Sequence, residues 1–258
     1  MVSIGSGTSI AFTAFTTQAT VKPGGGKVAA ASSAAPALAA AREASAATAS
    51  QPSTGGKKDF ATVAKDARAA LDAGYQASGK TGDIYTSFSD WQTMLGGMDR
   101  RSLHAIASNE GGQFSEAEQV GAENIMNKQL ETAMGVDTPA GVANLSTNSF
   151  LKGIRFLDTV SDEEKTSMAW AEKRAGLQFS YEMRRERDGQ QAEDVESDSP
   201  LVKLIKGGLD NLRQTGDPSR QLKDTPEYQQ AVQLSEQLKA GLKAKDKGGS
   251  ARAVDITA

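Results

Sequence analysis

From residue 57 onward, apolar residues recur at steps of three and four, which is the spacing of one face of an α-helix. The clearest stripe consists of Phe60, Val63, Ala64, Ala67, Leu71 and Tyr75. Similar stripes follow around Trp91, Leu103, Met126, Ile154, Ala171, Leu204 and Leu234. Runs of β-branched residues that alternate with polar ones, which would predict strands, are missing. The pattern therefore predicts an all-α fold, a single irregular multi-helix domain of about eight or nine helices.

Capping residues indicate where several of these helices begin. Ser115 with Glu118, and Ser161 with Glu164, have the spacing of a capping box, in which each residue satisfies an exposed amide of the other. The first box should open a helix that stops at Gly135, and the second should open one long helix.

Four prolines each follow Ser, Thr or Asp, as is typical of the first position of a helix. They are Pro139, Pro200, Pro218 and Pro226. We expect the last helix to end near Lys245.

Residues 1–56 have a different composition, because Ala, Ser, Thr and Gly dominate them. Their only charged residues are Lys22, Lys27, Arg42 and Glu43. Such a segment cannot bury enough apolar area to offset the entropy of an ordered chain. The sequence thus predicts a disordered arm over residues 1–56, a helical domain over 57–245 and a short flexible tail over 246–258. The apolar stretch at 10–15 is alternatively a docking peptide.

The composition excludes several kinds of site. The 258 residues contain no Cys and one His, and the formal net charge is −3. Without Cys there are no disulfides, thiol nucleophiles or thiolate metal sites. The single His104 argues against a His-rich zinc site, and we expect it at the surface or at a helix end. The near-neutral charge argues against a nucleic-acid partner.

The sequence also bears on location. No stretch approaches the roughly 20 apolar residues that span a bilayer. The first 21 residues lack the basic start of a cleavable secretory signal. We therefore expect no membrane span and a cytoplasmic protein, with export that leaves the N-terminus uncleaved as the alternative.

Residues 107–118, between two expected helices, contain the best-defined candidate site. Asn109, Gly112, Phe114, Ser115 and Glu118 stand at the third, sixth, eighth, ninth and twelfth positions of this segment. In this spacing, residues 99–134 resemble a degenerate form of the helix–loop–helix of the EF-hand family. The resemblance implies Asn109, Ser115 and Glu118 as candidate calcium ligands.

The segment departs from the EF-hand pattern at two ligand positions. Ala107 stands where the family has Asp, and Gly111 offers no side-chain ligand. We therefore expect a structural turn that binds no calcium, and no cofactor elsewhere. In such a turn Gly112 bends the chain, Phe114 is buried and Ser115 caps the next helix.

Two further features suggest roles of their own. Glu110, followed by Gly111 and Gly112, resembles the catalytic Glu region of muramidase-like glycoside hydrolases, where an acid at a helix end protonates the leaving oxygen. A second carboxylate and the family's Gly- and Thr-rich element are not found at convincing positions. Trp91 and Trp170 are expected to anchor the core rather than to bind a ligand.

These observations predict a non-enzymatic helical protein of bacterial type that binds other proteins, with residues 1–56 as one contact segment. Its Ala-, Ser- and Thr-rich, Cys-free composition resembles that of proteins of the flagellar or secretion apparatus. Two alternatives stay open at this point. One is a calcium- or effector-responsive regulator built on the EF-hand-like segment, and the other is a glycan hydrolase that uses Glu110. The identity of the partner and the oligomeric state do not follow from the sequence.

Overall fold

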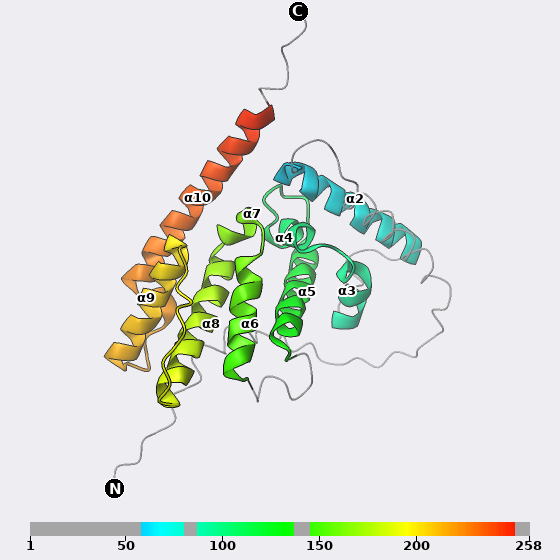
Figure 1. Cartoon of the computed structure of the whole chain (residues 1–258). Helices are drawn as coiled ribbons and strands as arrows, with labels where there is room; N and C mark the ends of the chain where they lie inside the picture. The colour runs from blue at the N-terminus through cyan, green and yellow to red at the C-terminus, as the bar shows by residue number, and fades with distance from the viewer. Residues whose placement is uncertain (1–57, 80–86, 137–144, 251–258) are drawn as a thin grey trace, which may run out of the picture. The chain divides into compact units, whose positions relative to one another are not determined.

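The computed structural model describes residues 58–79, 87–136 and 145–250, with side chains up to residue 244. All of these belong to one structural unit. No strand occurs in these ranges, and the all-α prediction is confirmed (Figure 1). The elements are α2 (Phe60–Ser78), α3 (Phe88–Leu95), α4 (Arg100–Ser108), α5 (Glu116–Met134), α6 (Thr147–Asp158), α7 (Asp162–Lys165), α8 (Met168–Arg187), α9 (Pro200–Thr215), the 3₁₀-helix η4 (Leu222–Asp224) and α10 (Pro226–Ser250).

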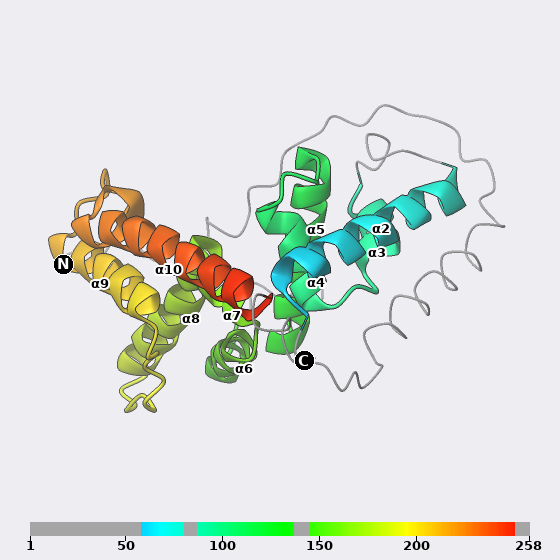
Figure 2. The same ribbon diagram turned by 90° about the horizontal axis from the view of Figure 1, so that it is seen from above.

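The long helices form a series in which each packs against its neighbour. Helix α2 contacts α4, α4 contacts α5, α5 contacts α6, α6 contacts α8, α8 contacts α9, and α9 contacts α10. The short α3 lies against α5. Seen from above in Figure 2, α10 runs back toward the start of the series, where its C-terminal half approaches α2 and α4. The first and last helices of the described part thereby come close to each other.

Helices α2 to α5 share the first part of the core. The predicted stripe of α2 is buried up to Leu71, and Trp91 and Leu95 of α3 pack into the same cluster. A Cβ at Gly121 of α5 would overlap the indole of Trp91, so glycine is required where α3 meets α5. The prediction that Trp91 anchors the core is confirmed.

Helices α6, α8 and α9 bury the second part of the core. Trp170 is 3% exposed, and its Nε1–H donates to the carbonyl of Leu157 at 2.9 Å. This bond satisfies the polar group of a buried indole, and it confirms Trp170 as a core anchor. The guanidinium of Arg174, 2% exposed, is held by Asp158 at 2.7 Å and by the carbonyl of Val195 at 2.9 Å.

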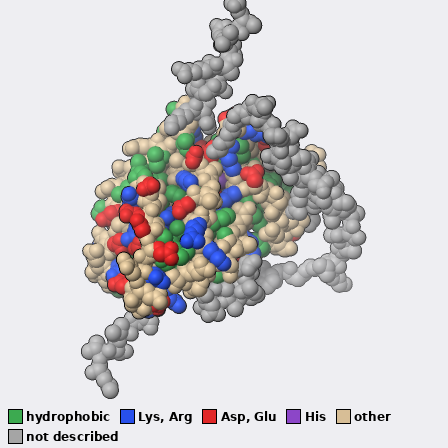
Figure 3. Space-filling view, in the orientation of Figure 1, with side chains coloured by type: hydrophobic (Ala, Val, Ile, Leu, Met, Phe, Trp, Pro, Cys, Tyr) green, Lys and Arg blue, Asp and Glu red, His purple; other side chains and the backbone are tan. Residues whose placement is uncertain are grey.

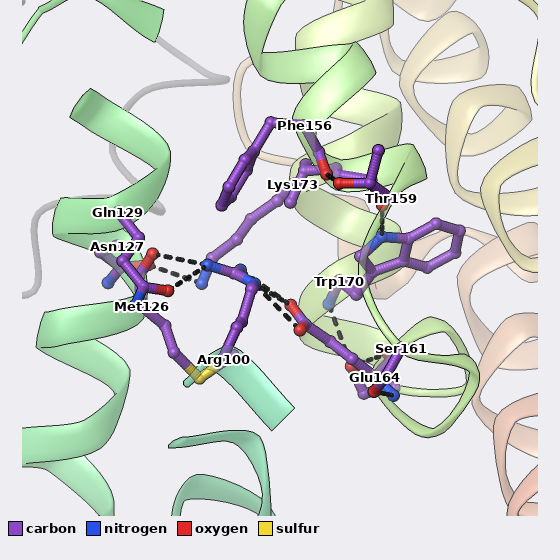
Figure 4. Close-up of polar contacts among 12 residues, drawn as sticks. Arg100, Met126, Asn127, Gln129, Phe156, Thr159, Ser161, Glu164, Trp170 and Lys173 are labelled. Atoms are coloured by element: carbon purple, nitrogen blue, oxygen red, sulfur yellow. Dashed lines mark hydrogen bonds and ion pairs between the residues drawn. The ribbon is translucent and has the colours of Figure 1, made fainter. Parts of the chain in front are cut away.

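Arg100, the first residue of α4, joins the two parts of the core (Figure 4). Its guanidinium binds Glu164 of α7 through Nε and Nη2, with Nη2 at 2.8 Å from Oε1. It also donates to the carbonyl of Met126 at 3.0 Å and to Oε1 of Gln129 at 3.2 Å, both on α5. The ring of Phe156 on α6 lies 4.9 Å from the guanidinium carbon. One side chain thus contacts α5, α6 and α7.

Two further contacts reinforce this junction. Arg101 forms an ion pair with Glu163, whose side chain is 14% exposed. Burial raises the pKa of Glu163, but the hydrogen bonds and charge of Arg101 outweigh it, and the pKa falls to about 2. Lys173 of α8 donates to Oδ1 of Asn127 on α5 at 2.6 Å, and burial lowers its pKa.

The structure corrects one predicted helix. Ser161 does not open a long helix, because α7 ends after a single turn and α8 begins anew with Ser167 as its N-cap. The hydroxyls of Thr166 and Ser167 donate to the last carbonyls of α7, which closes that turn. The carboxylate of Glu164 binds Arg100, a partner that the local spacing does not reveal.

The prolines give a mixed outcome. Pro200 and Pro226 begin α9 and α10 as predicted. Pro218 begins no helix, and this prediction is wrong. The carboxylate of Asp217 instead accepts hydrogen bonds from the amide and hydroxyl of Ser219, at 2.9 Å and 2.7 Å, and holds a turn before η4.

Other predictions concern the ends of the chain. The arm over residues 1–56, the stretch at 10–15 and Pro139 lie outside the described residues. Helix α10 continues to Ser250, past the expected end near Lys245. The expected boundary of the 246–258 tail therefore falls within a helix.

We expect Arg100→Ala to lower the free energy of unfolding by about 3 kcal/mol, because it leaves the buried Glu164 carboxylate without its guanidinium. Urea denaturation followed by circular dichroism measures this change. A matched control is Arg184→Ala, whose ion pair with Asp188 is 42% exposed on both sides and should contribute less than about 1 kcal/mol. Equal losses in the two variants would contradict a special role for the junction.

Candidate functional site

The segment between α4 and α5 forms a closed turn. Asn109 adopts a left-handed conformation with φ 44°, and Gly112 does so with φ 65°. The side chain of Asn109 forms two hydrogen bonds with the backbone of Phe114, both at 2.9 Å. Its Nδ2 donates to the carbonyl of Phe114, and its Oδ1 accepts from the N–H of Phe114. Phe114 is 5% exposed. The predicted bend at Gly112 and the predicted burial of Phe114 are both confirmed.

The predicted capping box is also present. The N–H of Ser115 donates to Glu118 at 2.8 Å, and the hydroxyl of Ser115 accepts from the N–H of Glu118 at 3.3 Å. Two residues of α2 complete the site, because Nη1 of Arg68 lies 2.9 Å from both Glu118 oxygens and the hydroxyl of Tyr75 lies 2.8 Å from one. Burial raises the pKa of Glu118, but the hydrogen bonds from Ser115, Tyr75 and Arg68 outweigh it and lower that pKa.

This geometry bears directly on the three candidate calcium ligands. The loop brings Asn109, Ser115 and Glu118 together, yet their side-chain oxygens accept hydrogen bonds from within the protein. A cation at Glu118 would have to displace the guanidinium of Arg68. Across the described residues, no group of three or more His, Asp or Glu side chains could hold a metal ion. Arg68 was missed by the sequence analysis, because no spacing rule links it to Glu118.

Glu110 lies in the same turn, but its side chain interacts with α10 and not with α2. Its Oε2 forms an ion pair with Nζ of Lys243 on α10 at 3.2 Å. The pair connects the α4–α5 turn to the last helix. It also places Glu110 at the mouth of a cleft between these elements.

The cleft has a volume of about 250 Å³ and lies between α2, α4, the α4–α5 turn, the end of α7 and α10. Its apolar wall consists of Phe60, Ala61, Ala64, Ala105 and Leu242. Charged side chains from the turn, α7 and α10 surround this wall. Acidic, basic and apolar side chains are interspersed over the face of the molecule shown in Figure 3.

The cleft does not follow from the sequence pattern, because its walls come from segments far apart in the chain. The predicted stripe around Leu234, which continues through Leu238 and Leu242 on α10, was the only local signal. It indicated an apolar helix face but not what that face opposes.

His104 corrects another prediction. It is 5% exposed rather than at the surface, and its ring lies 5.7 Å from that of Phe60. Helix α4 lies between α2 and α5, so its side chains are buried over Leu103–Ile106 and not only along one stripe. Burial lowers the pKa of His104 to about 4, although the charge and a backbone hydrogen bond of Glu163 act in the opposite direction.

No protein-family model, no curated protein and no solved structure matches this chain. Within the described ranges, no helix is both long and apolar enough to cross a membrane.

We expect Ser115→Ala to lower the free energy of unfolding by about 1 kcal/mol through loss of the cap. Phe114→Ala should lower it by about 3 kcal/mol, because the ring is buried. Thermal denaturation in millimolar calcium and in chelator should give the same losses, since Arg68 already neutralises Glu118. A calcium-induced rise of several degrees in the melting temperature that disappears in Glu118→Gln would refute this interpretation.

We also expect the protein to lose stability in mild acid through His104. Its pKa is about 4 in the folded chain against 6.5 for the ordinary group, so the unfolded chain binds the proton more readily. The stability is full above pH 6.5 and should fall by about 3 kcal/mol as the pH drops to 4. The pKa of Glu163 makes a separate contribution, which is lost as the pH falls from 4.5 toward 2.

The measurement is urea denaturation across this pH range, with His104→Gln as the control. The variant should lose less stability than the wild type between pH 6.5 and 4. Parallel pH profiles for the two proteins would show that His104 does not titrate in the way its burial implies.

Proposed function

We propose that this chain is a non-enzymatic helical interaction protein of bacterial type, which binds a partner protein through the cleft between α2, α4 and α10. One observation carries the proposal. The two ends of the helical series meet around an apolar cleft of about 250 Å³ with charged side chains at its mouth. Binding energy at protein interfaces is concentrated where an anchoring side chain fills such a pocket.

The wall formed by α10 supports this proposal. Leu242 lines the cleft and stays partly exposed, whereas Phe60 on the opposite wall is buried. An apolar side chain from a partner would remove the remaining surface of Leu242 from water, which is favourable by about 25 cal/mol per Å². Helix α10 packs mainly against α9, so the cleft can widen slightly without disturbing the core.

The remaining parts of the proposal come from the sequence. The composition is similar to that of flagellar or secretion proteins, and residues 1–56 supply a second contact segment. The protein acts in the cytoplasm or after export without cleavage. No observation supports the two alternative functions. For the calcium-responsive regulator, Glu118 is bound by Arg68. For the glycan hydrolase, Glu110 is bound by Lys243.

Site-specific photo-crosslinking of the full chain in its host tests the proposal. A photoreactive amino acid in place of Gln113, an exposed residue of the cleft, should yield an adduct with one partner protein. Leu242→Asp should strongly reduce this adduct, because a carboxylate replaces part of the apolar wall.

The matched control is Val232→Asp on the same helix. Val232 is 37% exposed and does not line the cleft, so this change should leave the adduct intact. The absence of an adduct at Gln113, or equal effects of the two Asp variants, would refute the cleft as the binding surface.

A further inference from the structure

We infer that the cleft selects a partner segment in which an apolar side chain is accompanied by a nearby carboxylate. This inference rests on the proposed function and adds the chemistry of the partner. It follows from which polar groups of the cleft already have fixed partners and which can exchange them.

The deep polar groups of the cleft are already satisfied. The hydroxyl of Thr166 donates to the carbonyl of Glu163 at 2.8 Å, and the carbonyl of Thr166 accepts from Ser235 at 2.6 Å. The carboxylate of Glu163 is held by Arg101 in a pair where both side chains are less than 20% exposed, at 14% and 17%. A group that enters the cleft therefore finds apolar contacts and no unpaired donor or acceptor from these residues. Such an environment favours an apolar side chain.

The charged groups at the mouth are held less firmly. Lys239 and Lys243 lie one turn apart on α10. Nζ of Lys239 lies 3.0 Å from Glu236, whose side chain is 70% exposed, and Nζ of Lys243 lies 3.2 Å from Glu110 and is itself 57% exposed. The other member of each pair is partly exposed, Lys239 at 30% and Glu110 at 23%, so solvent reaches both ion pairs. Ion pairs open to solvent contribute roughly 0–1 kcal/mol. A carboxylate from a partner can therefore replace either acid at little cost.

Among the charged side chains of the cleft that can change partners, the basic ones outnumber the acidic one, and this favours binding of an anion. Of the described acidic side chains that line the cleft, Glu163 is fixed by Arg101, and only Glu110 has an exposed partner. Each lining lysine belongs to an ion pair in which one of the two side chains is exposed, Glu236 in the pair of Lys239 and Lys243 itself in the pair with Glu110. A cationic group would have to release Glu110 from Lys243 and would then face both ammonium groups. A carboxylate between the two lysines gains charge-assisted hydrogen bonds, while the attached apolar group stays in the cleft.

Two small probes with the same apolar tail and opposite charge test this inference on the full chain. Sodium octanoate and octyltrimethylammonium are titrated at low salt, and binding is followed by ligand-observed nuclear magnetic resonance. Octanoate should bind at least about ten times more tightly than the cation. The Lys239→Gln/Lys243→Gln double variant should remove this preference, and Glu110→Gln should strengthen octanoate binding. Leu242→Asn should weaken the binding of both probes, because it removes part of the apolar wall without adding a charge.

Lys203→Gln on α9 is the matched control, because Lys203 also has an exposed ion pair but lies outside the cleft. It should leave both affinities unchanged, and circular dichroism should show the same helix content in every variant. Absent octanoate binding, equal or stronger binding of the cation, or a preference that survives the double lysine variant would overturn the inference.

The two proposals can fail separately. Octanoate should compete with the partner adduct at Gln113, and Lys239→Glu/Lys243→Glu should weaken that adduct. If the adduct depends on Leu242 but not on the lysines, the proposed function stands and the acidic partner is wrong. If octanoate binds without competing with the adduct, the cleft is a site for a free amphipathic acid, and the partner segment is overturned.

Discussion

The guanidinium of Arg100 is the contact on which the arrangement of the two helical parts depends. It is the only described side chain that binds Glu164 of α7 while also hydrogen bonding to α5 and stacking on Phe156 of α6. Glu164 is 3% exposed, and a carboxylate that deep is strongly destabilising without a counter-charge. Because α4 and α7 are tied at this point, Ala105 and Glu163 are held in place as one wall of the cleft.

The hydrogen bonds of Arg100 fix the relative orientation of the helices more than they add to stability. A buried ion pair often stabilises a protein no more than a well-packed apolar contact of the same volume would. A guanidinium that binds a carboxylate through two nitrogens and also donates to Met126 and Gln129 accepts only a narrow range of helix orientations, however. We interpret Arg100 as the residue that selects one alignment of the two apolar cores. A second ion pair lies beside the first, between Arg101, the next residue of α4, and Glu163, the preceding residue of α7.

The sequence predicted those features that depend on neighbours within a few residues. The stripe of α2, the capping box of Ser115, the stop at Gly135 and both Trp anchors follow from local spacing, and all are present. The features that the sequence did not predict depend on partners far away in the chain. Arg100 meets Glu164 at a separation of 64 residues, which removes that carboxylate from its predicted local role. His104 is buried because α2 and α5 cover α4 from two sides, whereas a single apolar stripe assumes one covered side. The cleft itself requires the approach of α10 to α2, which no periodicity encodes.

The opposite wall of the cleft is held in a different way. Among the α10 side chains that the structure describes, up to residue 244, Ala231 and Ser235 are fully buried, and the hydroxyl of Ser235 donates to the carbonyl of Thr166 just after α7. Before this point α10 packs against α9, and beyond it the two described leucines, Leu238 and Leu242, stay partly exposed. The hydrogen bond of Ser235 therefore fixes where α10 crosses the end of α7, while the later turns depend on weak contacts such as the Lys243–Glu110 pair. A cleft with one wall fixed by buried ion pairs and the other held only at its base can admit side chains of different size without disturbing either core.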